Sequence, residues 1–104
     1  MCRPTMSERA CRHVRVHGRV QGVGYRAWTV DAAQRHDLTG WVRNLRDGTV
    51  EALICGDSAA VDAMLADMES GPPVANVKSV EARESDRAAP AGFEQRPTAE
   101  PPGA

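Results

Sequence analysis

Residues 18–26, with the sequence Gly-Arg-Val-Gln-Gly-Val-Gly-Tyr-Arg, restrict the fold of this chain more than any other segment. Residues 13–17 before them alternate polar and apolar side chains, which predicts a strand with one buried face. After them, apolar side chains recur at helical spacing and predict a helix over about residues 25–36. The glycines in between therefore predict a tight connection from a strand to a helix.

The same segment predicts an anion site. A glycine turn can direct several backbone N–H groups inward, and the first turn of the following helix adds its own unpaired N–H groups. Arg26 at the end of the segment adds a forked pair of donors with permanent positive charge. A phosphate group fits such a site, although a tight turn followed by an exposed arginine is the simpler alternative.

The spacing of the glycines excludes two common nucleotide-binding motifs. A P-loop requires a lysine followed by serine or threonine after its last glycine, and the only lysine of this chain is Lys78. A dinucleotide fingerprint requires an acidic residue at a set distance in a parallel βαβ unit, and 104 residues are too few for a doubly wound sheet. We therefore expect a phosphate site that does not serve a nucleotide.

Five further elements follow the first helix. They are, in order, strands at 39–45 and 49–55, a helix at about 58–70, a strand at 74–84 and a short strand at 93–96. Asp47-Gly48 separates the first two of them, a pair that is typical of a β-hairpin turn. The second helix keeps its apolar residues at i, i+3, i+4 and i+7 and should end near Ser70-Gly71, directly before two prolines.

The order β-α-β-β-α-β predicts a ferredoxin-like α+β sandwich, in which two helices cover one face of a four- or five-stranded antiparallel sheet. In this arrangement the first and second strands run parallel, with the third strand between them. We expect one folded domain at 12–96, a flexible N-terminal arm at 1–11 and a disordered proline-rich tail at 97–104.

Composition limits the partners and the compartment. The formal net charge of −1 argues against nucleic-acid binding, and no run of about 18 apolar residues could span a membrane. The N-terminus lacks the apolar segment of a signal peptide, so we expect a cytoplasmic protein. Its small size and lack of a spare apolar stripe favour a monomer.

Metal sites and disulfides are not expected. The three cysteines, at positions 2, 11 and 55, are odd in number and form no Cys-x-x-Cys pair, which argues against a disulfide framework and a zinc site. His13 and His17 share one face of the first strand but stand too far apart to hold one metal well, so we expect them on a solvated polar face.

Three segments together resemble the acylphosphatase family: residues 18–26, Gly40-Trp41-Val42-Arg43-Asn44, and Asp47-Gly48-Thr49-Val50-Glu51. The resemblance covers roughly residues 12–96 and includes the predicted order of elements. It implies that Arg26 and Asn44 are catalytic, Arg26 by gripping a phosphate and Asn44 by positioning the attacking water. The residues that it assigns to phosphate binding, largely through their backbone N–H groups, are Gln21, Gly22, Val23, Gly24, Tyr25 and Arg26. Some members carry a hydroxyl residue directly after the asparagine, where this chain has Leu45.

The resemblance implies a hydrolase that converts a small-molecule acyl phosphate into a carboxylate and inorganic phosphate. An acyl phosphate is already activated, so holding the phosphoryl group and orienting a water are the main tasks, and we expect no cofactor and no metal. Two alternatives stay open. One is a noncatalytic ferredoxin-like module that binds a small anion or a partner. The other is the acylphosphatase-like domain that begins hydrogenase-maturation proteins.

Overall fold

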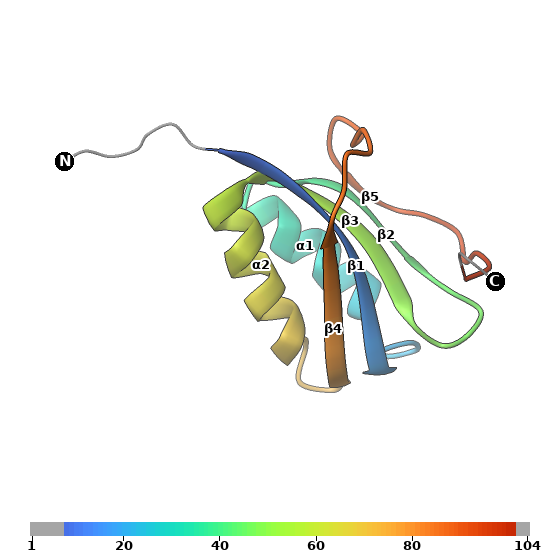
Figure 1. Cartoon of the computed structure of the whole chain (residues 1–104). Coiled ribbons are helices and arrows are strands. Elements are labelled where there is room, and N and C mark those ends of the chain that lie inside the picture. The colour runs from blue at the N-terminus through green and yellow to red at the C-terminus, as the bar shows by residue number, and fades with distance from the viewer. Residues whose placement is uncertain (1–7, 102–104) are drawn as a thin grey trace.

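The computed structural model describes residues 8–101, and its elements follow the predicted order (Figure 1). They are β1 (Arg9–Arg19), α1 (Tyr25–Arg35), β2 (Thr39–Asn44), β3 (Val50–Asp57), α2 (Ser58–Ser70), β4 (Asn76–Glu84) and β5 (Phe93–Gln95). Both helices lie on the same face of the sheet (Figure 1). The predicted ferredoxin-like α+β fold is confirmed. Within the described residues, neither helix is long and apolar enough to cross a membrane.

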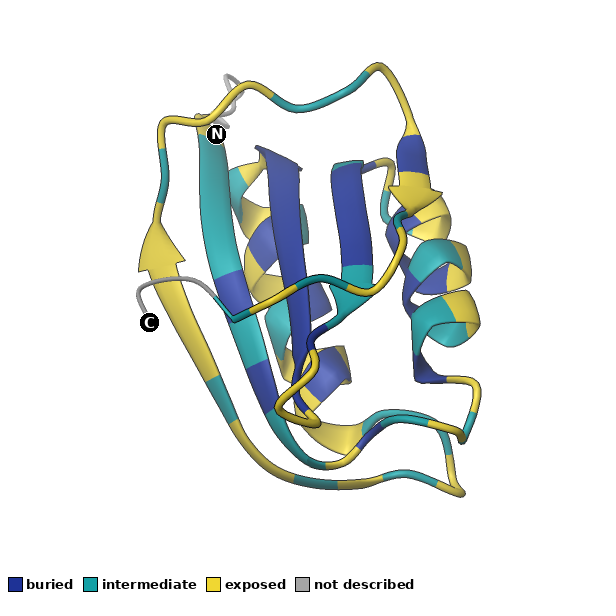
Figure 2. Ribbon diagram, turned by 90° about the vertical axis from the view of Figure 1, so that its right-hand side faces the viewer, coloured by how far each residue is buried: buried dark blue, intermediate teal, exposed yellow. Residues whose placement is uncertain are grey.

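The sheet has the strand order β4-β1-β3-β2-β5. β1 and β2 are both antiparallel to β3, so they run parallel to each other on either side of it, as predicted. β5 pairs parallel to β2, which makes the sheet mixed, whereas we expected an antiparallel one. The reason is that the connection after β4 passes along one end of the sheet to the opposite edge (Figure 2). β5 therefore starts from the same end as β2.

The core lies between the sheet and the two helices. Alternate residues of the strands face the helices, as period-two patterning requires, and the helices contribute their apolar stripes. The buried strand residues include Val14, Val16, Val42, Val50, Ala52 and Ile54, and the buried helix residues include Tyr25, Ala32, Ala33, Val61, Met64 and Met68. Figure 2 shows the central strands buried and the β4 edge exposed. Each such large side chain contributes about 1.5–3 kcal/mol by leaving water.

The β2–β3 hairpin turns at the predicted Asp47-Gly48 pair. Gly48 has a φ of 95°, which a side chain would disfavour. The Thr49 backbone N–H and its hydroxyl donate to the Asp47 carboxylate at 3.0 and 2.6 Å. The pKa of Asp47 is lowered to about 2, chiefly because the Thr49 hydroxyl and backbone N–H donate to its charged form. This turn matters for function because β2 ends at Asn44, directly before it.

The structure contradicts two expectations about the N-terminal side. Cys11 and Cys55 form a disulfide with an S–S distance of 2.06 Å. The antiparallel register places these two residues opposite each other on β1 and β3, and cysteine spacing alone cannot reveal such a pairing. Cys11 is also part of a strand that begins at Arg9, so the last residues of the expected flexible arm are in the sheet. Residues 1–7 of that arm, with Cys2, lie outside the described residues.

The segment after β5 also differs from the expectation of a disordered tail. Residues 97–101 are described, and Ala99 forms a parallel bridge with Leu45. The Ala99 N–H donates to the Asn44 carbonyl at 3.1 Å, and the Ala99 carbonyl accepts from the Arg46 N–H at 2.9 Å. The segment pairs here because the chain leaves β5 alongside β2, whose outer edge still has free backbone groups. Residues 102–104 lie outside the described residues.

Removing this C-terminal segment should lower stability. A chain that ends at Arg96 loses both backbone hydrogen bonds of Ala99. Because each such bond contributes about 0.5–1.5 kcal/mol net, we expect the free energy of unfolding to fall by roughly 1–3 kcal/mol in urea denaturation. The matched control ends at Pro101 and keeps Ala99, so it should equal the full chain within about 0.5 kcal/mol. Equal stability of all three chains would contradict a structural role for this pairing.

Candidate active site

The loop between β1 and α1 takes a backbone conformation that depends on its glycines. Gly22 and Gly24 have φ values of 75° and 78°. A Cβ atom at either position would meet nothing within 4 Å, so the requirement comes from the backbone angle and not from space. Side chains pay about 1–2 kcal/mol in this region, which explains why the sequence uses glycine here. Gly24 is the N-cap of α1 and supplies no capping side chain.

This loop leaves a row of backbone donors unused. In residues 8–101, none of the N–H groups from Gln21 to Ala27 donates a hydrogen bond to the protein. The first hydrogen bond into α1 runs from the Trp28 N–H to the Gly24 carbonyl, at 3.0 Å. Free N–H groups and the positive end of the helix dipole both favour an anion at this point. The loop thus presents free N–H donors of the kind that an anion site requires.

A pocket of about 140 Å³ lies next to these donors. Its lining residues are Val20, Gly22, Gly24, Tyr25, Arg26, Ala27, Asn44 and Gln95. We call it the anion pocket. It brings Arg26, at the start of α1, together with Asn44, at the end of β2. Arg26 is half-buried and forms no ion pair with any residue of the described chain, so its guanidinium is available to a ligand.

The Asn44 side chain carries a polar atom without a partner. Its Oδ1 is buried, and within residues 8–101 it accepts no hydrogen bond. A buried acceptor left unsatisfied costs about 1–3 kcal/mol, so native proteins rarely keep one without a reason. A lone asparagine beside a turn more often bonds its own backbone. Asn44 lines the anion pocket, and its unpaired Oδ1 is an acceptor to which the described protein supplies no hydrogen.

Five of the seven predicted site residues line the anion pocket, namely Gly22, Gly24, Tyr25, Arg26 and Asn44. Tyr25 contributes its backbone there, because its buried hydroxyl donates to the Met68 carbonyl at 2.8 Å. Burial also raises the pKa of Tyr25 far above its usual value, so the side chain stays neutral. Gln21 and Val23 are not among the lining residues, and Val23 packs against the core.

Two features of the site escaped the sequence analysis. Gln95 lines the anion pocket because β5 pairs with β2, a parallel pairing that no local pattern indicates. The Gln21 side chain crosses to the hairpin, where its Nε2 donates to the carbonyls of Leu45 and Thr49 at 2.7 and 2.8 Å. A single glutamine in a glycine loop carries no signal of a partner more than 20 residues away.

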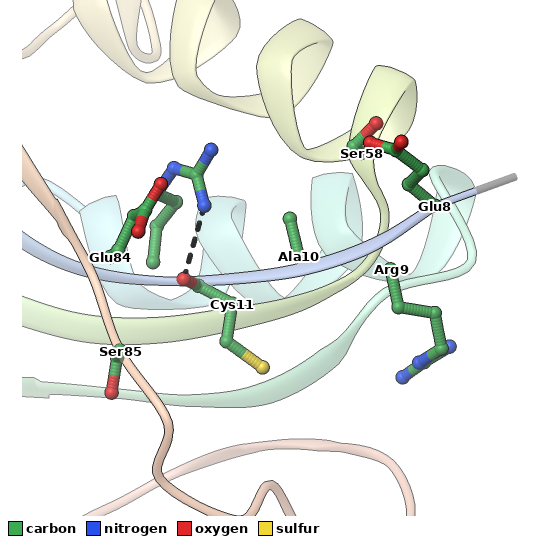
Figure 3. Close-up of a pocket in the computed structure, with 8 residues that line it drawn as sticks. Glu8, Arg9, Ala10, Cys11, Ser58, Glu84 and Ser85 are labelled. Atoms are coloured by element: carbon green, nitrogen blue, oxygen red, sulfur yellow. Dashed lines mark hydrogen bonds between the residues drawn. The ribbon is translucent and has the colours of Figure 1, made fainter.

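A second pocket, of about 300 Å³, lies where β1 begins and β4 ends. Its lining residues are Glu8, Arg9, Ala10, Cys11, Arg12, Ser58, Glu84 and Ser85. Figure 3 shows that its polar side chains do not converge: Arg9 and Ser85 point away from Glu8 and Ser58. The one hydrogen bond drawn there joins the Arg12 guanidinium to the Cys11 carbonyl, at 3.3 Å. This second pocket is lined by both acidic and basic side chains, which do not point toward a common centre. The anion pocket therefore remains the candidate site.

The helix-free face of the sheet carries a buried carboxylate. Glu51 is 1% exposed and accepts hydrogen bonds from His13 at 2.6 Å and from Arg43 at 2.7 Å. Burial by itself would raise the pKa of Glu51, but the hydrogen bonds from Arg43 and His13 outweigh it and hold the pKa below its usual range. We expected His13 on a solvated polar face. It instead contacts a buried partner, Glu51. Among residues 8–101, no three acidic, histidine or cysteine side chains are grouped to hold a metal ion.

Glu51 should make stability depend on pH. Its pKa is lower when folded, so the unfolded chain takes up the proton first, near pH 4.3. The ionised Glu51 side chain thus contributes its full stabilisation above about pH 4.3, and this stabilisation is lost as the pH falls through the pKa of Glu51 in the folded state. We expect Glu51→Gln to lower the free energy of unfolding by about 1–3 kcal/mol at pH 7, as measured by urea denaturation. The difference between variant and wild type should become smaller as the pH falls into the acid range. The control Glu94→Gln, at an exposed surface pair, should change little, and an equally small effect for Glu51→Gln would contradict this role.

The fold and the anion pocket define a class of small α+β proteins in which a glycine loop and the end of a neighbouring strand meet at a pocket. The sequence model of the acylphosphatase family matches residues 12–95. The chain belongs to the acylphosphatase family.

Individual relatives agree with this assignment. The acylphosphatase of Acidovorax sp. (strain JS42) is 51% identical over 87 residues, which cover 84% of this chain and 90% of that protein. The structure of an acylphosphatase from Coxiella burnetii has a TM-score of 0.83 and 35% identity, and the match covers 89% of this chain and 100% of that chain. The structure of T. kodakarensis HypF has a TM-score of 0.75 and 29% identity, but the match covers only 12% of that chain. Similarity thus extends over nearly the full length of acylphosphatases and over a small part of HypF.

Proposed function

We propose that this protein hydrolyses acyl phosphates to a carboxylate and inorganic phosphate in the anion pocket. The observation that carries the proposal is that Asn44, whose buried Oδ1 accepts no hydrogen bond within residues 8–101, lines the same pocket as Arg26. A site that only bound an anion would need donors alone. An unpaired acceptor beside those donors is what a water nucleophile requires.

The loop and Arg26 hold the phosphoryl group in this proposal. Free N–H groups from Gln21 to Ala27 donate to its equatorial oxygens, and the Arg26 guanidinium adds charge-assisted hydrogen bonds. Charge-assisted bonds are worth about 1.5–3 kcal/mol each. Because the transition state spreads negative charge over those same oxygens, the donors stabilise it without having to reorganise.

Asn44 orients the water. Its Oδ1 accepts one hydrogen of the water, which leaves a lone pair of the water oxygen directed at phosphorus. As the new bond from the water oxygen to phosphorus forms, the bond from phosphorus to the acyl oxygen breaks. The electron pair of that bond leaves with the carboxylate. No carboxylate or imidazole lines the pocket in the described chain, so the water proton passes to the phosphate or to solvent.

The proposal is tested with the full chain and benzoyl phosphate, an aromatic acyl phosphate whose hydrolysis can be followed by absorbance. We expect turnover that persists with a metal chelator present and that inorganic phosphate inhibits competitively. Phosphate binding without turnover would overturn the proposal and favour the noncatalytic anion-binding module.

We further propose that the protein acts as a monomer in the cytoplasm. Val74 is the exposed large hydrophobic side chain among residues 8–101, so these residues present no apolar patch of the size that stable dimers bury. Thiols in the cytoplasm are kept reduced, so Cys11 and Cys55 would there be held together by strand pairing alone.

A further inference from the structure

The Gln21 side chain links the two halves of the anion pocket. Gln21 belongs to the glycine loop, and both of the hydrogen bonds from its Nε2 go to the β2–β3 hairpin. They reach the Leu45 carbonyl at 2.7 Å and the Thr49 carbonyl at 2.8 Å. The Leu45 N–H also donates to the Thr49 carbonyl, at 2.9 Å. The carboxamide therefore joins the loop to both sides of the hairpin turn, at Leu45 directly after β2 and at Thr49 directly before β3.

This link lies one residue from Asn44. Leu45 follows Asn44 directly and is fully buried, so a hydrogen bond to its carbonyl restrains the backbone one residue beyond Asn44. Leu45 has no hydroxyl, and Oδ1 of Asn44 accepts no bond from any residue of the described chain, so no neighbouring side chain orients it through that oxygen. Its position relative to the loop is instead set through the main chain. Gln21 provides the side-chain hydrogen bonds that connect that main chain to the loop.

We propose that Gln21 is a positioning residue, whose side chain sets the distance between the phosphate-holding loop and the water-orienting Asn44. The inference rests on the proposed function of the anion pocket. Two carbonyl acceptors require two N–H donors on one nitrogen, which a carboxamide has and a carboxylate or thioether lacks. In-line attack needs the water and the phosphorus to be placed within a fraction of an ångström, and a 1 Å error can cost about 10²-fold in rate.

The test compares Gln21→Met, which keeps length but removes both donors, with Gln21→Glu, which keeps shape and places a carboxylate against two carbonyls. Gln34→Met is the matched control, because Gln34 is exposed on α1. Benzoyl phosphate turnover and the inhibition constant of inorganic phosphate are measured per folded molecule, at a temperature where circular dichroism shows each variant folded.

We expect kcat of both Gln21 variants to fall by about 10- to 100-fold, while the inhibition constant of phosphate changes by less than about 3-fold, since the loop N–H groups and Arg26 are intact. The Gln21→Glu variant should regain activity relative to wild type as the pH falls, because the protonated carboxyl has one donor again. Gln21→Met should show no such recovery.

Unchanged kcat per folded molecule in either Gln21 variant would overturn the inference and leave the proposed function standing. Equal losses of turnover and phosphate affinity would also overturn it, because they would indicate general damage to the loop. A wild-type protein that binds phosphate but never turns over benzoyl phosphate would overturn the proposed function and this inference together.

Discussion

Arg26→Ala should lower kcat/KM for benzoyl phosphate by about 10³- to 10⁵-fold, which is the range for an arginine that acts on a transferring phosphoryl group. Arg26 is half-buried in the anion pocket and has no ion-pair partner among the described residues. Replacing Arg26 therefore removes the positive charge that would face the ligand, and it leaves no protein carboxylate without its ion-pair partner. The loss should appear in kcat and also in the affinity for inorganic phosphate.

Arg26→Lys separates charge from geometry. Lysine keeps the positive charge but lacks the planar fork, so most of the rate should stay lost if two parallel hydrogen bonds are required. The matched control is Arg19→Ala, which removes an exposed arginine at the end of β1. If Arg26→Ala retained full activity while Arg19→Ala behaved the same, Arg26 would have no part in the reaction.

Asn44→Ala should reduce kcat by about 10²- to 10³-fold or more, the usual cost of removing one preorganised polar group from an active site. Phosphate inhibition should hardly change, because the donors that hold phosphate lie on the loop. Stability should hold or improve, since the substitution removes a buried acceptor that has no partner in residues 8–101. This pairing of lost turnover with retained stability distinguishes a catalytic group from a structural one.

Asn76→Ala is the control for that experiment, because Asn76 is exposed at the start of β4. Full turnover in Asn44→Ala would remove Asn44 from the mechanism. Loss of phosphate inhibition alongside turnover would instead mean that Asn44 contacts the phosphate itself. The two measurements together thus assign the role of Asn44 separately from that of Arg26.

Much of the fold and site could be predicted from local patterns, since each depends on residues close in the chain. Period-two alternation at residues 13–17, the Asp47-Gly48 turn and the apolar stripe of α2 each correspond to an element that the structure contains. The glycine turn was predictable because Gly22 and Gly24, with their positive φ angles, and the helix start that follows them form one continuous segment.

Contacts across the sheet were not predictable in the same way. Cys11 and Cys55 pair because the register of β1 against β3 sets them opposite each other, and a count of three cysteines suggested the contrary. The Ala99 bonds arise because β5 runs parallel to β2, so a proline-rich segment finds an open strand edge beside it. Neither register nor strand direction appears in hydrophobic periodicity, which records only which residues face the core.

The amino-acid sequence alone was sufficient to order the elements and to propose the glycine loop, Arg26 and Asn44 as the parts of the site. Only the tertiary structure decided how those parts meet: that Asn44 Oδ1 is left without a partner in residues 8–101, and that Gln21 joins the loop to the hairpin. The physical reason is that backbone conformation follows from neighbouring residues, whereas hydrogen-bond satisfaction is settled by whichever groups the folded chain brings within about 3 Å.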